Sequence, residues 1–340
     1  MSRVSAAGVV RGVAVIGLLA VFPFLFPQHW VLNIAFFTLM YAALATAWNL
    51  LGGYSGYISL GNVAFFGAGA YAVSIIFTRY AGVGTGYRPF YVLPLIGLGV
   101  GLASVPLGWL AFRTRGATFA IVTLTLLFVV QQLAFNLHGL TNGSQGILLP
   151  LPPFPNATFE RPFYYAMLGL LVLALGVCWW ARGSKLGLGL FAIRDDEDRA
   201  RGLGQRVTMA KLIAFALSTG LTAMVGGLWA YYLGQIYPQF AVDPLVTIGM
   251  VLMVYLGGKG TLWGPLVGAL VLVPAQQYMA YRLGGSELYL IAYAAVFLFV
   301  IRLMPRGILP SLADQWRRRR GRSGGRPTAP ARATEELAAS

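Results

Sequence analysis

The sequence predicts an all-α, polytopic integral membrane protein with about ten transmembrane helices. Of its 340 residues, 58% are hydrophobic and only 10% are charged, whereas soluble domains contain about 25% charged residues. Apolar stretches that could cross a hydrocarbon core about 30 Å thick recur along the whole chain. The low charge excludes an ordinary soluble enzyme, and the mean hydropathy of +0.71 excludes a disordered or fibrous chain.

Ten windows of the sequence have the length and composition of spans. They cover residues 9–27, 30–51, 59–78, 90–112, 117–137, 163–181, 211–233, 245–257, 263–281 and 288–305. The first window resembles a secretory signal, but no small-x-small cleavage site follows it, so we interpret it as a span. We therefore expect a transmembrane domain over residues 1–310. The arginine-rich segment 311–340 is expected to be a basic, disordered tail.

The basic residues predict the orientation of the spans. An even number of spans places both termini on one side, and the positive-inside rule makes this the cytoplasmic side. With this orientation, the 25 Lys and Arg residues fall on the cytoplasmic side except for Arg79, Arg88, Arg161 and Arg282. The net charge of +15 therefore reflects contact with membrane lipid and not with nucleic acid.

The sequence lacks the residue patterns of nucleotide-binding, metal-binding and proton-coupling sites. The only Gly-Lys pair, Gly258-Lys259, lacks the spacing of a nucleotide-binding P-loop. His29 and His138 have no metal-binding spacing, and the single Cys178 allows neither an internal disulfide nor a thiolate metal site. No Asp, Glu or Lys lies in the middle of a span, which disfavours a proton-coupled pump. We expect no catalytic residue, metal or cofactor, and a protein that is not an enzyme.

The 182–210 loop, between the sixth and seventh windows, contains the strongest local signal. Residues 190–204 are expected to form one short amphipathic helix, with acid-before-base pairs between Asp195 and Arg199 and between Glu197 and Arg201. A helix lying on lipid is the alternative to a helix that docks on a protein. The four consecutive acids at 195–198 would be repelled by anionic lipid, which favours a protein partner.

Two glycine-rich segments, residues 51–62 and 256–265, interrupt the spans. Such glycine density indicates either broken or re-entrant backbone beside a solute path or close helix packing through small residues. Close packing is also what we expect of residues 67–70 (GAGA). The candidate polar groups near a path are Tyr54, Ser55, Ser59, Asn62 and Thr261.

Six motifs occur in an order that resembles one known family. They are residues 47–56 (AWNLLGGYSG), 59–71 (SLGNVAFFGAGAY), 113–123 (RTRGATFAIVT), 192–196 (AIRDD), 211–215 (KLIAF) and 256–269 (LGGKGTLWGPLVGA). Together they resemble the branched-chain amino-acid ABC-transporter permease family, in particular its M-type inner-membrane subunit. The resemblance extends from about residue 45 to residue 309.

The resemblance implies a pore-forming subunit of an ATP-driven importer in the bacterial inner membrane. Its expected partners are a paralogous permease subunit, two cytoplasmic ABC ATPase subunits that hydrolyse ATP, and a periplasmic or extracellular solute-binding protein. The 182–210 loop matches the cytoplasmic coupling region of the family. The implied ATPase contacts are Ala192, Arg194, Asp195, Asp196, Glu197, Ala200 and Gly202.

Two other functions stay open at the level of sequence. The solute could be a branched-chain or similar amino acid, but related permeases carry urea or short amides, and a few polar groups on an apolar wall suit all of these. A stand-alone secondary carrier or channel could use the same path, and its 182–210 loop would then be an inert linker.

Overall fold

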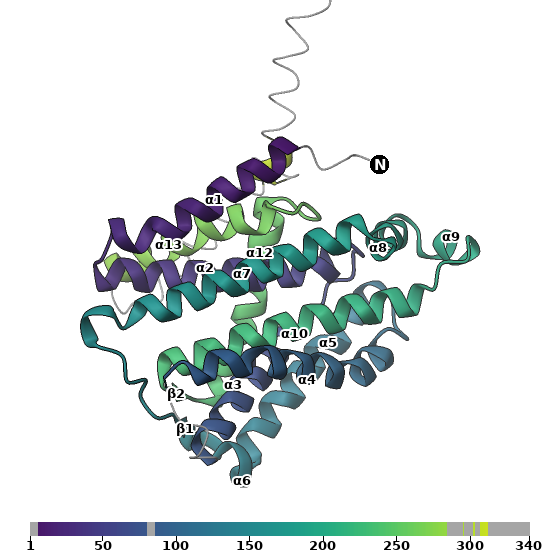
Figure 1. The fold of residues 1–340 in the computed structure, drawn as a ribbon. Helices are drawn as coiled ribbons and strands as arrows, with labels where there is room; N and C mark the ends of the chain where they lie inside the picture. Colours follow the sequence, from purple (N-terminus) through teal and green to yellow (C-terminus); the bar gives the residue numbers. More distant parts are fainter. Residues whose placement is uncertain (1–5, 80–85, 284–294, 296–301, 303–306, 312–340) are drawn as a thin grey trace, which may run out of the picture.

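The computed structural model describes residues 6–79, 86–283, 295, 302 and 307–311, and this part of the chain is almost entirely helical. The long helices are α1 (Ala6–Leu25), α2 (His29–Gly52), α3 (Asn62–Arg79), α4 (Arg88–Ala111), α5 (Gly116–Asn136), α7 (Glu160–Gly183), α10 (Val207–Leu233), α12 (Pro244–Gly257) and α13 (Gly264–Leu283). Most of them run roughly side by side in two groups, and α12 runs steeply across its neighbours (Figure 1). Helices α1, α2, α7, α12 and α13 form one group, and α3, α4, α5 and α10 form the other.

The helices confirm the predicted fold class. Each of the first nine windows overlaps one long helix of the described chain. Six segments are long and apolar enough to cross a membrane, namely α2, α4, α5, α7, α10 and the stretch 238–257, which joins the short α11 (Pro238–Ala241) to α12. The tenth window and the predicted tail, apart from residue 311, lie almost entirely outside the described residues, so the count of ten stays a prediction.

Helix α10 is the centre of the bundle because small residues allow it to approach its neighbours. It packs against α2, α3 and α4, and it is the most buried of the six spans. A Cβ atom added to Gly226 would lie 2.0 Å from the carbonyl oxygen of Phe66, and one added to Gly69 would lie 2.0 Å from that of Ala223. The backbones of α3 and α10 therefore touch, as expected of small residues at helix contacts in lipid.

The two ends of the bundle carry different structures. At one end, β1 (Ile147–Leu148) pairs antiparallel with β2 (Gln235–Ile236) close to α6 (His138–Thr141) (Figure 1). The short helices η2 (Gly143–Gln145) and η3 (Asn156–Thr158) belong to the same connection. At the other end, the loop end, the chain forms α8 (Lys185–Asp195) and α9 (Glu197–Gly202).

His29, for which the sequence indicated no metal-binding spacing, has a carboxylate neighbour in the folded chain. Its Nδ1 lies 2.9 Å from a carboxylate oxygen of Glu160 at the start of α7. This polar contact joins the first turns of α2 and α7. Its partners are separated by 131 positions, which is why the sequence pattern did not reveal it.

Candidate functional site

The 182–210 loop forms two helices, and the expectation of a single helix over residues 190–204 is wrong. Helix α8 ends at Asp195, and Asp196 is extended, with φ −162° and ψ 111°. The Oδ1 atom of Asp196 accepts hydrogen bonds from the backbone N–H groups of Asp198 and Arg199, each at 3.0 Å. Asp196 is therefore the N-cap of α9, since its side chain satisfies N–H groups that lack a partner within the helix.

The break changes one of the two predicted ion pairs and keeps the other. Arg199 pairs with Asp196 at 3.0 Å and not with Asp195, because the helix that would align Arg199 with Asp195 ends between them. Arg201 Nη2 lies 3.2 Å from Glu197 Oε1, as the four-residue spacing predicts.

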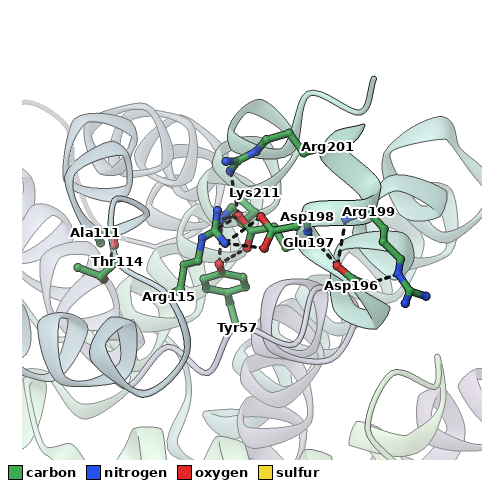
Figure 2. A network of polar contacts seen from close by, with 10 residues as sticks. All are labelled: Tyr57, Ala111, Thr114, Arg115, Asp196, Glu197, Asp198, Arg199, Arg201 and Lys211. Atoms are coloured by element: carbon green, nitrogen blue, oxygen red, sulfur yellow. Dashed lines mark hydrogen bonds and ion pairs between the residues drawn. The ribbon is translucent and has the colours of Figure 1, made fainter. Parts of the chain in front are cut away.

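Glu197 is the centre of a polar network that joins four parts of the chain (Figure 2). Lys211 in the first turns of α10 places its Nζ 3.2 Å from Glu197 Oε1 and donates to the hydroxyl of Tyr57 at 3.0 Å. Tyr57 in turn donates a short hydrogen bond to Glu197 Oε2. Arg115, which precedes α5, lies 3.6 Å from Glu197 and 3.0 Å from Asp198. Glu197 therefore connects α9 to α10, α5 and the segment between α2 and α3.

Burial makes this network more than a surface ion pair. The side chain of Lys211 is 2% exposed and that of Glu197 is 12% exposed. The Lys211 ammonium also lies 4.2 Å from the ring centroid of Tyr57 and 5.3 Å from that of Phe112. A cation over an aromatic face is attracted to it, so the rings partly replace the water that Lys211 has lost.

The titration of the network follows from these contacts. Burial alone would raise the pKa of Glu197, but the hydrogen bond from Tyr57 and the charge of Lys211 outweigh it and hold this pKa below its ordinary value. Burial, followed by the hydrogen bond to Glu197, raises the pKa of the Tyr57 hydroxyl. Glu197 is therefore a carboxylate and Tyr57 a neutral phenol at neutral pH.

The outer surface of α8 and α9 carries a different set of side chains. Of the seven residues that the family resemblance indicates, Ala192, Arg194, Asp195 and Gly202 are exposed, Asp196 and Glu197 are partly buried, and Ala200 is buried. Two more residues here are exposed, although the sequence did not indicate them as ATPase contacts. The side chain of Arg199 is 86% exposed, and Leu203 is 88% exposed. One face of α8 and α9 therefore contacts the polar network around Glu197, and the other face is exposed on the surface of the chain.

A family model for the branched-chain amino acid transport system permease component matches residues 30–301 of the chain. The chain belongs to this permease family. The permease is 28% identical to the high-affinity branched-chain amino acid transport permease LivM of Escherichia coli K12, over 92% of this chain and 77% of that protein. It is 24% identical to a probable LivM of Methanocaldococcus jannaschii, over 80% of this chain and 90% of that protein.

A relative that matches a shorter part of the chain is named for a different solute. The permease is 35% identical to the autoinducer 2 import permease LsrC of Salmonella paratyphi B, over 29% of this chain and 30% of that protein. No solved structure is significantly similar to the chain. The family match and the six apolar helices identify a transport component and a multi-pass protein of the bacterial inner membrane.

The candidate path residues of the permease lie in two places. Tyr54 and Ser55 follow α2 at the loop end, and Thr261 lies in the connection between α12 and α13. The Thr261 hydroxyl accepts from the N–H of Gly264 at 3.0 Å and donates to the carbonyl of Gly258 at 2.8 Å, so it closes a turn before α13. Tyr54 and Ser55 are buried, and Thr261 is partly buried.

Ser59 and Asn62 lie deeper, in a buried polar cluster at the start of α3. The Asn62 side-chain nitrogen donates to Ser218 Oγ of α10 at 3.2 Å. Backbone N–H groups at the same point donate to Thr123 of α5 and Thr247 of α12, at 3.0 and 3.2 Å. Within the described residues, Ser59 Oγ and Asn62 Oδ1 have no hydrogen-bond partner. Four helices therefore bring hydroxyl and amide groups together inside an apolar bundle.

Sequence reasoning missed the partners that fix Glu197 in place. Tyr57 and Lys211 are 140 and 14 positions away from Glu197 in the chain. A lysine at the very start of an apolar window is the one local signal that could have indicated a buried ion pair, because an unpaired charge there is costly. Nothing in the local pattern identifies its carboxylate.

Proposed function

We propose that this chain is the permease subunit of a binding-protein-dependent ABC importer that moves branched-chain amino acids across the inner membrane. ATP hydrolysis takes place on two separate ATPase subunits, and a paralogous permease and an external solute-binding protein complete the importer. The observation that carries the proposal is the family match over residues 30–301 together with the two-sided structure of α8 and α9.

The outward face of these two helices suits an ATPase surface. Leu203 is a large apolar side chain with 88% exposure directly after α9, and the charged side chains of Asp195 in α8 and Arg199 in α9 are 78% and 86% exposed. Exposed apolar and charged side chains on the same short segment are the kinds of group from which a protein contact is made. The inward face transmits the movement, because Glu197 binds Lys211 of α10, and α10 packs against α2, α3 and α4.

The cluster at the start of α3 is the proposed solute contact inside the membrane. An amino acid needs hydrogen-bonding groups for its ammonium and carboxylate and an apolar wall for its branched side chain. Ser59, Asn62 and Ser218 supply such groups, and phenylalanines such as Phe65 and Phe215 supply apolar surface nearby. Tyr54, Ser55 and Thr261 would continue the path toward the loop end.

Transport by the purified complex tests this function. The chain, its paralogous permease, the two ATPases and the binding protein are reconstituted in liposomes, and labelled leucine uptake is measured with and without ATP. We expect ATP-dependent uptake that excess isoleucine and valine suppress and that urea and acetamide do not. Uptake by this chain alone without ATP would indicate a secondary carrier or channel, and competition by urea or acetamide would indicate the amide-type permeases.

A further inference from the structure

Two glycine turns meet at the loop end of the bundle. The first glycine turn comprises residues 53–61, between α2 and α3, and the second comprises residues 258–263, between α12 and α13. The buried side chain of Asn49, in the last turn of α2, binds the second turn in two ways. Its Nδ2 donates to the carbonyl of Thr261 at 2.9 Å, and its Oδ1 accepts from the N–H of Gly260 at 3.0 Å.

Two arginines, one in α7 and one in α8, bind the same two turns. Arg182, in the last turn of α7, donates from Nη1 to the carbonyl of Gly260 at 2.9 Å. Arg194, near the end of α8, donates from Nη1 to the carbonyl of Gly53 at 3.3 Å. Both guanidinium groups lie near the ring of Phe191, at 5.7 and 5.2 Å from its centroid. Each turn therefore receives a charged donor from the segment that ends in α9.

The glycines are required where Arg194 passes between the turns. Gly260 has φ +76°, and a Cβ atom there would lie 2.8 Å from Arg194 Nη1 and 3.1 Å from the carbonyl oxygen of Gly53. Gly56 has φ +79°, and a Cβ atom there would lie 3.1 Å from Arg194 Cγ. The left-handed backbone and the missing side chains bring both turns close to one guanidinium.

We propose that Asn49, Arg182 and Arg194 form the inner gate of the translocation path by holding the two glycine turns together. This inference rests on the proposed function, since a gate presupposes transport. Both turns interrupt the helical backbone, and they contain the candidate path residues Tyr54 and Ser55 in the first turn and Thr261 in the second. Holding the two turns together therefore closes the path at this end, and separating them opens it.

The position of Arg194 explains how the gate is driven. Arg194 and Glu197 are three residues apart on either side of the break at Asp196, so a displacement of α9 by an ATPase also displaces Arg194. The bonds to Gly53 and Gly260 are made to backbone carbonyls, so they require the correct positions of the turns. These three residues are thus positioning residues for the gate.

Thiol labelling in the reconstituted complex tests the gate. A cysteine is introduced by Ser55→Cys, a nearly isosteric change at a buried position in the first glycine turn. The single native Cys178 is buried and serves as an internal blank. We expect slow reaction with a water-soluble maleimide in the wild-type background without nucleotide. Arg194→Ala or Asn49→Ala should raise this rate about tenfold, because access then follows local opening.

Matched variants separate a gate from a general structural role. Arg113→Ala, which removes an exposed arginine packed on Trp109 at the same end, should leave the labelling rate unchanged. Arg194→Lys, which keeps a positive donor, should restore part of the slow rate. The gate variants should also hydrolyse ATP with less leucine transported per ATP, whereas a merely destabilised protein would lose both activities together.

Two outcomes distinguish the failures. If the wild-type complex shows no ATP-dependent uptake, the proposed function is wrong. If uptake is normal but Arg194→Ala and Asn49→Ala label no faster than Arg113→Ala, the proposed function stands and the gate is wrong.

Discussion

Removal of the Glu197 carboxylate should destabilise the folded chain strongly. In Glu197→Ala, the Lys211 ammonium stays buried and keeps, of the hydrogen bonds described above, only the one to the Tyr57 hydroxyl at 3.0 Å. Breaking a buried ion pair by removing one partner costs about 3–5 kcal/mol. Because the hydroxyl and two aromatic rings still face Lys211, we expect the lower end, about 3 kcal/mol. For a chain of this size that corresponds to a fall in Tm of roughly 6 °C.

The assay uses the one cysteine of the chain. Cys178 is buried, so a thiol-reactive dye in detergent reports unfolding as Cys178 becomes accessible. Asp195→Ala is the matched control, because the Asp195 side chain is 78% exposed and lies 3.8 Å from Arg194. An exposed pair of this kind contributes about 0–1 kcal/mol, so the control should melt within about 2 °C of the wild type.

A double variant tests the cause of the effect. Lys211→Met removes the buried charge, so Glu197→Ala combined with Lys211→Met should cost less than the sum of the two single changes. Additive losses would show that the two groups do not stabilise each other. A Glu197→Ala protein that melts with the wild type would refute the assignment of a buried ion pair.

Three further predictions follow from the same contacts. The pKa of folded Glu197 lies below its ordinary 4.5, so the stability that the Glu197 carboxylate contributes is complete above pH 4.5 and is lost as pH falls through the folded pKa. The difference in Tm between wild type and Glu197→Gln should therefore stay constant from about pH 7 to about pH 5 and become smaller below about pH 5. A difference that already becomes smaller above about pH 5 would contradict the lowered pKa. Gly226→Ala should cost about 1–3 kcal/mol in the same melting assay, since its Cβ would lie 2.0 Å from the Phe66 carbonyl, whereas Gly169→Ala, with open space around its Cβ, should not destabilise. Asn62→Ala should raise the half-saturating leucine concentration for uptake about tenfold, and an unchanged half-saturating concentration would remove Asn62 from the solute contact.

The sequence predicted the helices well because hydropathy is a local property. The nine windows coincide with long helices, and the glycine segments proved to contain non-helical turns, while close packing holds at Gly67 and Gly69. The break at Asp196 was missed because a favourable series of acid-before-base pairs indicates a helix, while the N-cap bonds that end it depend on backbone geometry.

The contacts that organise the loop end were beyond local pattern. Asn49 and Gly260 are 211 positions apart, and Tyr57 and Lys211 are 154 positions apart. Such pairs form only when the bundle brings the ends of different helices together, so their residue types alone do not identify them. That the 182–210 loop is a coupling region stays a prediction from the family resemblance, and the resemblance did not separate the inward-facing Glu197 and Ala200 from the outward-facing Asp195.

The most direct test of the account is a crosslink between the 182–210 loop and an ATPase subunit. A photoreactive residue is placed at Leu203, directly after α9. As a control it is placed at Leu151, a 78% exposed leucine in the connection between β1 and α7. In the assembled complex, we expect position 203 to crosslink to an ATPase and position 151 not to. An ATPase crosslink from position 151, or none from position 203, would contradict the proposal that ATP hydrolysis drives transport through α8 and α9.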